Sequence, residues 1–481
     1  MNPETTLQPA IQTAPMLDAA GAPVDVPPGD LAALRSSVAG DTVAAGEPGY
    51  EEARRIWNAM VERRPALIAR CRDAEDVATC VRFAADRGVA LGVRGGGHNI
   101  GGRALVPGGV TIDFSARRGV RLDPATGIVE VEPGATLGDL DRATVPAGRV
   151  VPSGIVSETG VAGLTMGGGF GWLSRRWGLT CDHLVGADVV TAAGDRLSVD
   201  ADSHPDLLWA LRGGGGGFAV VTAFRFASRA LPGPVLAGPI FHRPEATAEV
   251  AHRFRAHFAE APEERGGMLK LGAAPPAPFL PPELHGRPVA VVIACHGGDA
   301  TEAERDLAPL RGGDGVAADL VTERSFADFQ AMFDAGEPKG KRNYWKSEYV
   351  TALDDEILAI LLERHQCLPA ASANIKVFAL GGAVSRVPPA ASAAGHRDAR
   401  YIVVLATSWD HPADDARNVA WVRDGWAAVH ARSGRGGYIN FLTEDTTAEE
   451  TQTARGGVDL EKLRAVKRRW DPAGVLGGLG A

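Results

Sequence analysis

Apolar positions in the first half of the chain alternate between helical and extended spacing. In DVATCVRFAADR, residues 76–87, they recur on one helix face, and the pattern ends at Gly88. Helical spacing returns at 136–143 and 204–212. Short apolar or alternating runs predict strands at 89–93, 110–114, 128–131, 185–191 and 218–226. The first half of the chain is therefore a succession of strands and helices.

The pattern changes near Ala230, where proline-rich connections begin. They separate predicted strands at 289–294, 375–378 and 401–406 from predicted amphipathic helices at 301–310, 355–367 and 412–432. This predicts a second, α+β domain. At the other end, residues 1–28 are rich in Pro, Ala and Thr without periodicity, which predicts a mobile tail.

Composition narrows the class of protein. Apolar residues make up 45% of the 481 positions and charged residues 23%, as in soluble globular proteins. The formal net charge of −9 leaves no broad basic face, which argues against nucleic acid and anionic membranes as partners. Residues 1–34 contain no Lys or Arg and no apolar run, so no secretory signal is predicted, and no window resembles a membrane helix. We expect a cytoplasmic protein.

The five cysteines are odd in number and show no C-x-x-C spacing, so the sequence predicts neither a disulfide framework nor a metal site. Nothing in the sequence indicates an oligomeric state.

Glycine is concentrated in three clusters. The chain holds 60 glycines, about 12% of its residues against a usual share of about 7%. The clusters lie at 95–102, 160–171 and 213–217, and each adjoins a predicted helix or strand. Bare backbone at such places can approach a phosphate or a planar cofactor closely. No G-x-x-x-x-G-K-[ST] motif follows, and the elements around the clusters do not fit a dinucleotide-binding Rossmann unit.

Two nucleophilic side chains lie in or beside these clusters. His98 lies within the first, in VRGGGH, and Cys181 follows the second, in GLTCD. Each alone would be read as an ordinary buried residue. Together they are two nucleophiles that could flank one cofactor.

Five sequence blocks, in this order, resemble those of the berberine-bridge-enzyme-like FAD-linked oxidases of the vanillyl-alcohol oxidase superfamily, which have a PCMH-type FAD-binding domain. The blocks are RGGGH at 94–98, GLTMGGGFGWL at 163–173, GLTCD at 178–182, WALRGGGG at 209–216, and YINF at 438–441 with LRAVKRRWDP at 463–472. The similarity covers roughly Gly49 to Pro472.

The resemblance implies an α+β fold, in which a two-subdomain FAD-binding domain joins an α+β substrate domain with an antiparallel sheet. It divides the chain into an FAD-binding domain at 29–229, a substrate-binding domain at 230–433 and a C-terminal segment at 434–481 that returns to the FAD domain. It also implies FAD bonded covalently through its 8α-methyl to His98 and through C6 to Cys181. Both bonds withdraw electron density from the ring and should favour hydride uptake.

The family's motifs imply further cofactor contacts on matching positions of this chain. These are Arg94, Gly95, Gly96, Gly97, Asn99, Gly101, Thr159, Gly160, Gly163, Leu164, Gly167, Gly168, Gly171, Trp172, Asp182, Leu184, Gly217, Val220, Asn440 and Phe441.

The resemblance implies hydride transfer from an alcohol, hemiacetal or amine carbon of a small-molecule substrate to the flavin, with O2 as acceptor and H2O2 as product. Many relatives use the last tyrosine of a Y-x-N-Y motif as the base, but this chain has Phe441 there. Tyr438 keeps the first position. The segment NYWKSEYV at 343–350 resembles a K-S-[DE]-Y strand that faces the flavin, and it offers Tyr344, Lys346 and Glu348 as further catalytic candidates.

Alternate strand residues share a face, so Tyr344, Lys346 and Glu348 would lie opposite Trp345, Ser347 and Tyr349. The sequence leaves open which set faces the flavin. Leu184 lies where a bulky residue in plant relatives obstructs oxygen, so a dehydrogenase with another acceptor is an alternative. A flavin-binding protein with little turnover is a second one, motivated by Phe441.

Overall fold

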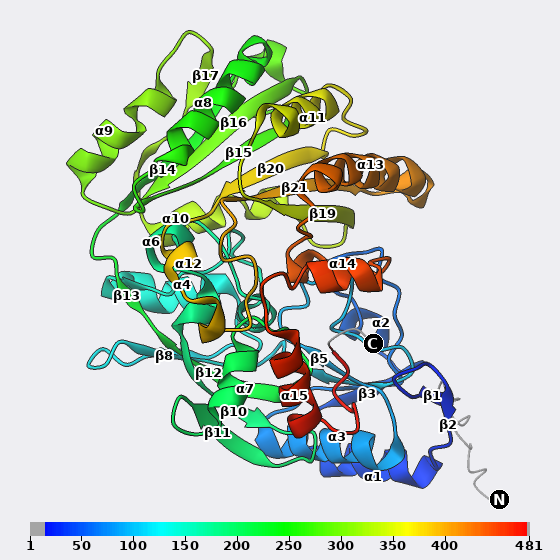
Figure 1. Ribbon diagram of the computed structural model, residues 1–481. Coiled ribbons are helices and arrows are strands. Elements are labelled where there is room, and N and C mark those ends of the chain that lie inside the picture. Colours follow the sequence, from blue (N-terminus) through cyan, green and yellow to red (C-terminus); the bar gives the residue numbers. More distant parts are fainter. Residues whose placement is uncertain (1–14, 479–481) are drawn as a thin grey trace, which may run out of the picture.

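The computed structural model describes residues 15–478 and shows two halves, one built on two small sheets and one on a large antiparallel sheet (Figure 1). The halves contribute to one shared apolar core. This is the predicted α+β architecture, with a mixed sheet in one half and an antiparallel sheet in the other.

The first half holds a four-stranded and a five-stranded sheet. The four-stranded sheet runs in the order β3 (Thr42–Ala44), β4 (Leu67–Ala69), β6 (Val110–Asp113) and β5 (Leu91–Arg94), and it is mixed because β6 is parallel to both of its neighbours. The five-stranded sheet is antiparallel, in the order β11 (Arg196–Asp200), β10 (Leu184–Val190), β12 (Val220–Ala227), β8 (Ile128–Val131) and β7 (Val120–Leu122).

Helices of this half follow the predicted signals. α3 (Ala74–Arg87) begins where the Asp73 carboxylate accepts from the Glu75 and Asp76 amides, and it ends at Gly88 with φ +67°. Further helices are α1 (Pro28–Ser37), α4 (Leu137–Thr144) and α7 (Pro205–Leu211). The predicted end at Gly88 is confirmed, whereas the Asp73 cap starts α3 two residues before the predicted position.

The second half is built on an eight-stranded antiparallel sheet. Its main path is β17 (Val316–Asp319), β14 (Val235–His242), β16 (Pro288–His296), β15 (Arg265–Ala273), β20 (Asn374–Ala379), β21 (Tyr401–Trp409) and β19 (Arg342–Val350), and β18 (Thr322–Arg324) also pairs with β14. Four helices cover one face: α8 (Thr247–Ala259), α9 (Ala300–Arg311), α11 (Asp355–Gln366) and α13 (Asp415–Ser433).

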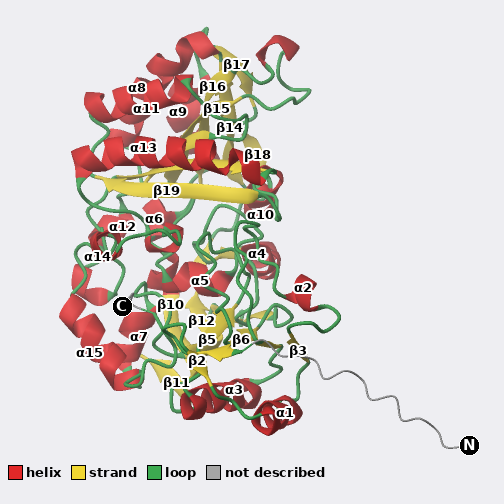
Figure 2. Ribbon diagram, turned by 90° about the vertical axis from the view of Figure 1, so that its right-hand side faces the viewer, coloured by secondary structure: helices red, strands yellow, loops and turns green. Residues whose placement is uncertain are grey.

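The other face of this sheet meets the first half of the chain. Figure 2 shows α13 on one side of β19 and the loops of the first half on the other. Met268, Trp345 and Tyr349 on this face belong to the same apolar core as Phe170 and Cys181. The strand periodicity thus gives the sheet one face for its helices and one for the candidate site.

The end of the chain packs onto the first half. α14 (Ala448–Thr453) is followed by α15 (Leu460–Trp470), which lies against α7. Leu463 and Val466 of α15 are buried in the core of the five-stranded sheet.

Two parts of the chain differ from the predicted elements. Residues 412–414 form a 3-10 turn, so α13 begins at Asp415. Residues 16–24 form a hairpin, β1 (Met16–Leu17) with β2 (Pro23–Val24), where a mobile tail was expected. Met16 is buried, and the Leu17 amide donates to the Gly108 carbonyl at 2.9 Å, so backbone pairing rather than a periodic pattern holds this segment. The rest of the predicted tail, 1–14, lies outside the described residues.

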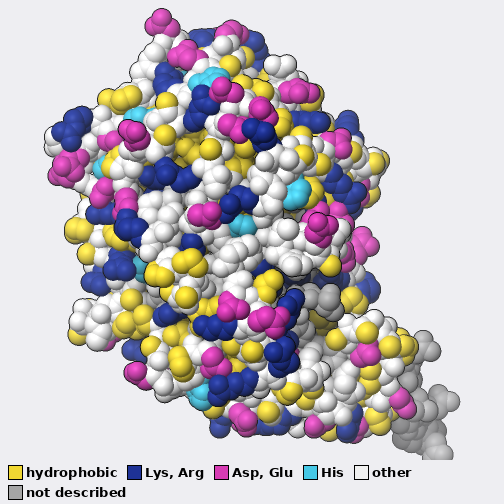
Figure 3. All heavy atoms as spheres, in the orientation of Figure 1, with side chains coloured by type: hydrophobic (Ala, Val, Ile, Leu, Met, Phe, Trp, Pro, Cys, Tyr) yellow, Lys and Arg dark blue, Asp and Glu magenta, His cyan; other side chains and the backbone are white. Residues whose placement is uncertain are grey.

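On the face shown in Figure 3, acidic and basic side chains are interspersed rather than gathered by sign. Every helix within residues 15–478 is too short or too polar to span a bilayer.

Candidate active site

The first glycine loop leaves β5 and lies directly against the second. A Cβ atom on Gly96 would stand 2.6 Å from the Cα of Gly160, and one on Gly95 would stand 2.7 Å from the Pro133 carbonyl oxygen. Gly97 has φ +67°, which favours glycine. The two loops therefore touch through bare backbone, and this contact brings His98 to the end of the first loop.

His98 stacks on one face of an aromatic pair and has one nitrogen without a partner. Its ring stacks on Trp57 with centroids 4.5 Å apart, and Trp57 stacks on Trp345 of β19 at 5.1 Å. The Nε2 atom of His98 is buried and has no hydrogen-bond partner in the structure. Burial lowers the pKa of His98 to about 4. The imidazole is therefore neutral near pH 7, with a nitrogen available to a group that the chain itself does not supply.

The rest of the first loop is tied to the chain around it. The Arg94 guanidinium lies 3.8 Å from the Asp113 carboxylate, while its buried Nε has no partner. Asn99 Nδ2 donates to the Asn440 carbonyl at 3.3 Å, and a Cβ on Gly101 would stand 2.8 Å from the Leu442 carbonyl oxygen. The first loop and the C-terminal segment are thus held together.

The second glycine loop continues from α5 (Val161–Met166) to Gly171. Added Cβ atoms would overlap the Asn440 side chain at Gly167 and the Ser153 carbonyl at Gly171, while Gly168 has φ +110°. At Gly163 a Cβ would meet nothing within 4 Å. The loop is close-packed on its protein side and open at Gly163, as a cradle for a bound group would be.

Cys181 lies in a 3-10 turn, Thr180–His183, and is fully buried. Its amide donates to the Gly168 carbonyl at 2.9 Å. Burial raises the pKa of the thiol, the Asp182 carboxylate raises it further, and the Arg397 and Arg212 guanidiniums oppose this. Near neutral pH, Cys181 is therefore a thiol rather than a thiolate.

Asp182 is occupied by protein partners. Arg397 donates to its two carboxylate oxygens at 2.8 and 2.6 Å, and the Leu179 amide donates at 2.8 Å. Asp182 therefore anchors the turn that carries Cys181 to the loop that carries Arg397.

A row of aromatic side chains connects the surroundings of His98 to those of Cys181. Trp345, which stacks on Trp57, lies 5.2 Å from Phe441, and Phe441 lies 5.0 Å from Tyr438, as centroid distances. Cys181, Tyr438, Trp345 and Trp57 belong to one core cluster, and Phe441 packs against it. A chain of ring contacts therefore leads from His98 to Tyr438, which shares a core cluster with Cys181.

The Tyr438 hydroxyl can donate a hydrogen bond, because its oxygen already accepts two. Its oxygen accepts from the Gly169 amide at 3.0 Å and from Asn440 Nδ2 at 2.8 Å. Burial raises the pKa of Tyr438, so the phenol is neutral. With its oxygen supplied by two donors, Tyr438 is suited to donate a hydrogen bond and not to accept a proton.

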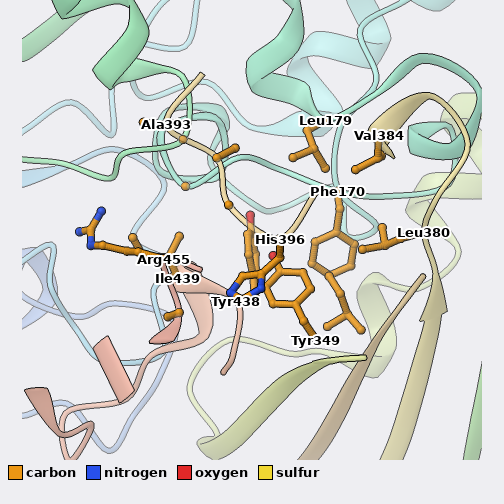
Figure 4. Close-up of a pocket in the computed structure, with 16 residues that line it drawn as sticks. Phe170, Leu179, Tyr349, Leu380, Val384, Ala393, His396, Tyr438, Ile439 and Arg455 are labelled. Atoms are coloured by element: carbon orange, nitrogen blue, oxygen red, sulfur yellow. The ribbon is translucent and has the colours of Figure 1, made fainter. Parts of the chain in front are cut away.

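Tyr438 lines a pocket of about 470 Å³, including its opening to solvent (Figure 4). In the close-up, Tyr438, Tyr349 and Phe170 lie together, with His396 against Tyr349. The rings of Tyr349 and His396 stack at 4.3 Å, and His396 adopts a left-handed φ of +54°. Burial raises the pKa of Tyr349.

Tyr344, Lys346 and Glu348, the other expected catalytic residues, lie on the opposite face of β19. Tyr344 donates to the Asp445 carboxylate at 2.7 Å, and Lys346 donates to Glu450 at 2.9 Å. The structure therefore corrects the expectation for these three residues. They pack toward α13 and the C-terminal segment, whereas Trp345, Ser347 and Tyr349 face the site.

Glu348 is the most enclosed of the three. Its side chain is fully buried, and its carboxylate accepts from the Gly436 amide at 2.9 Å, the Arg435 amide at 3.0 Å and Trp426 Nε1 at 3.1 Å. His430 and Ser433 also contact it. Such a saturated carboxylate ties the end of α13 to β19.

Several residues with implied cofactor contacts lie outside the shared core. Leu184 is buried in the core of the five-stranded sheet, and Val220 packs with α3 and the four-stranded sheet. Thr159 contributes its carbonyl to the Leu137 amide at 2.9 Å, and the Gly217 carbonyl accepts from Lys467 Nζ at 2.6 Å. The Leu164 carbonyl accepts from Asn440 Nδ2 at 3.2 Å. These contacts stabilise the fold around the site.

Trp172 has a different position. It is buried in the shared core, packs against Phe329 and Phe333 with centroids about 5 Å apart, and leaves Nε1 without a partner.

Sequence reasoning missed polar residues on the site-facing side of the large sheet. Lys270 and Lys376 lie on β15 and β20, and Glu337 follows a 3-10 turn at Asp334–Gly336. These three residues lie outside the five sequence blocks that carry the family resemblance. A single lysine within an apolar strand forms no recognisable motif. Strand alternation was the available signal, since Lys270 follows Met268 at a period of two. No group of three or more His, Cys, Asp or Glu side chains in the described part is arranged to hold a metal ion.

Two apposed glycine loops, an unpartnered neutral imidazole and an antiparallel sheet over them define an FAD-binding oxidoreductase architecture. A family model described as an FAD binding domain matches residues 65–200. The (R)-6-hydroxynicotine oxidase of Paenarthrobacter nicotinovorans is 31% identical over 448 residues, covering 91% of this chain and 95% of that protein.

Solved structures agree with this match. The 6-hydroxy-D-nicotine oxidase of Arthrobacter nicotinovorans superimposes with a TM-score of 0.81 at 28% identity, covering 92% of this chain and 97% of that one. Glucooligosaccharide oxidase from Acremonium strictum shares the fold, with a TM-score of 0.81 at 23% identity over 93% of this chain and 98% of that one. The chain belongs to the family of FAD-linked oxidases that includes (R)-6-hydroxynicotine oxidase, it is an FAD-linked oxidoreductase, and it shares the fold of berberine-bridge-enzyme-like proteins.

The position of Glu348 makes a testable prediction. Glu348→Ala removes the acceptor of several buried donors and should cost about 3–5 kcal/mol of unfolding free energy. Glu363→Ala, at an exposed position of α11, should change it by less than about 0.5 kcal/mol. Urea unfolding measures both, and flavin per folded protein should be unchanged in each. Equal stabilities, or flavin loss confined to the Glu348 variant, would contradict the structural role.

Proposed function

We propose that the chain is an oxidase that holds FAD by two covalent bonds, one from His98 to the 8α-methyl group and one from Cys181 to C6. The observation that carries the proposal is the neutral imidazole of His98, whose buried Nε2 has no partner and whose ring stacks on Trp57, a member of the same core cluster as Cys181. The related structure from Acremonium strictum is described by its 6-S-cysteinyl, 8α-N1-histidyl FAD, a precedent for attachment through one cysteine and one histidine.

When bound, FAD supplies a two-electron acceptor for a hydride from a substrate carbon. The chain's residues supply binding and orientation. The loops at 95–102 and 160–171 expose backbone that suits the pyrophosphate, and the aromatic row around Trp57, Trp345 and Phe441 excludes water from the ring's surroundings.

Tyr438 is proposed to orient the substrate. Because its phenol is neutral and its oxygen already accepts two hydrogen bonds, it can donate to a substrate oxygen or nitrogen. Phe441 cannot take a proton, so Tyr438 and Asn440 act through positioning rather than as bases.

The proposed reaction is oxidation of an alcohol, hemiacetal or amine carbon, with O2 as acceptor and H2O2 as product. Its support is the full-length similarity to an oxidase of a hydroxynicotine, a cyclic amine by its name. The alternative of a dehydrogenase with another acceptor was suggested by Leu184, whose side chain packs in the core of the five-stranded sheet and whose amide donates to the Cys181 carbonyl.

We also propose that residues 29–229 and 434–478 hold the cofactor and that 230–433 hold the substrate. The division is supported by the sheets to which these residues belong and by the packing of α15 against α7.

The covalent bonds can be separated by substitution. The acid-precipitated wild-type protein should stay yellow, and so should His98→Ala and Cys181→Ala, because each keeps one bond. The double variant should release its flavin into the supernatant. Cys295→Ala, a control at another fully buried thiol, should behave as the wild type. A yellow pellet from the double variant would exclude these two residues as the attachment sites.

The pH dependence of attachment should differ between the two bonds. His98, with a pKa lowered to about 4, is already neutral above about pH 5. FAD attachment to the apo Cys181→Ala variant should therefore have a rate independent of pH between 6 and 9. The thiol pKa of Cys181 is raised, so attachment in His98→Ala should accelerate with pH by up to about tenfold per unit, because the thiolate is the nucleophile.

Absorbance of the acid-washed protein, sampled over time, gives both rates. Identical pH profiles for the two variants would contradict the assigned protonation states.

A further inference from the structure

Two lysines face the cofactor side of the large sheet from adjacent strands. Lys270 of β15 and Lys376 of β20 are paired across the two strands, next to the pair of Met268 with Phe378. Met268 and Phe378 belong to the core shared with Cys181, whereas Leu269 and Val377 belong to the core under the helices. Strand alternation therefore places both lysine side chains on the face that meets the glycine loops.

The strand register also locates the lysines between the two attachment residues. Across the sheet, Lys376 is paired with Val404, and Val404 is paired with Ser347. Ser347 stands between Trp345 and Tyr349 on β19. Trp345 belongs to the stack that ends at His98, and Tyr349 shares the core of Cys181. Lys270 and Lys376 are therefore aligned, across the strands, with a position on β19 between Trp345, toward His98, and Tyr349, toward Cys181.

A single carboxylate faces this pair. Glu337 forms an ion pair with Lys376, and both side chains are largely buried. The carbonyl of Glu337 accepts from Trp57 Nε1 at 2.9 Å, which connects this group to the ring that stacks on His98. The charge of Glu337 also acts on His98 and on Lys270, so all of these groups are neighbours.

The cluster therefore has an unbalanced charge. Two ammonium groups share one carboxylate, and that carboxylate is bonded to Lys376. Lys270 makes no hydrogen bond or ion pair with any residue between 15 and 478, and the side chains beside it on this face include Met268, Phe378 and Val404. Burial and the neighbouring Lys376 lower the pKa of Lys270, as expected for a cation that lacks a partner. Lys270 is half-buried, so its ammonium group lies at the sheet face, where an anion could pair with it.

We propose that Lys270 binds a carboxylate of the substrate, so that this enzyme acts on an anionic molecule with an apolar body. The apolar part would lie against Met268, Phe378 and Val404, and the carboxylate would complete a charge-assisted hydrogen bond to the Lys270 ammonium. This inference rests on the proposed function, since it assumes that the oxidised substrate occupies the space between the sheet and the cofactor.

Carboxylate binding to the holoenzyme tests the proposal without knowledge of the substrate. Benzoate and hexanoate are the probes, and benzamide and hexanamide are their uncharged counterparts of similar shape. Isothermal titration calorimetry, with the bound flavin spectrum recorded in parallel, gives the affinities. The carboxylates should bind at least tenfold more tightly than the amides.

Variants assign the selectivity to one side chain. Lys270→Met should reduce carboxylate affinity at least tenfold and leave amide affinity within twofold, while Lys270→Arg should retain most of the carboxylate affinity. Lys339→Met is the matched control, because it removes the same charge from an exposed position two residues beyond Glu337. It should leave both affinities unchanged.

Three results would overturn the proposal: equal binding of carboxylates and amides, no binding of either carboxylate, or wild-type carboxylate affinity in Lys270→Met. The titrations use only preparations with one flavin per chain after acid precipitation. Failure of carboxylate selectivity therefore counts against the role of Lys270 alone, whereas a colourless preparation counts against the proposed function.

Discussion

The backbone of Gly96 touches the backbone of Gly160, and the geometry of the candidate site depends on this contact. Any side chain at either position would push the two loops apart, because an added Cβ would come within 3 Å of the opposite backbone. With the loops in contact, His98 extends from the first loop and stacks on Trp57, which stacks on Trp345. The second loop holds the turn that carries Cys181, because the Cys181 amide donates to the Gly168 carbonyl. The glycines thus place two nucleophiles that are far apart in the sequence at one aromatic-lined region.

Burial has opposite consequences for the reactivity of His98 and Cys181. It favours the neutral form of both, and that form is reactive for the imidazole and unreactive for the thiol. The proposed bond to His98 therefore needs no change of protonation, whereas the proposed bond to Cys181 depends on loss of the thiol proton. Arg397 and Arg212 favour that loss, and the carboxylate of Asp182, which is paired with Arg397, opposes it.

The parts of this arrangement that follow from local sequence could be predicted, and the parts that follow from packing could not. The end of α3 is fixed by Gly88, and the glycine clusters mark where backbone must be bare. By contrast, a strand such as 342–350 shows two faces in the sequence without indicating which is inward. Aromatic residues occur on both faces, and the choice depends on α13 and the residues that follow it, which surround Glu348 with donors.

The same reason explains why the lysine pair escaped sequence reasoning. Lys270 and Lys376 are more than a hundred positions apart and become neighbours only through the order of β15 and β20. The hairpin at 16–24 is a similar case, because its order comes from pairing with residues 90 and 108 rather than from a pattern of its own.

Proteolysis of the denatured holoenzyme followed by mass spectrometry tests the central claim most directly. If His98 and Cys181 flank the same flavin ring, the digest should contain one species in which the peptides bearing these residues are joined through a single FAD. Separate peptides, each with its own flavin or with none, would contradict the account.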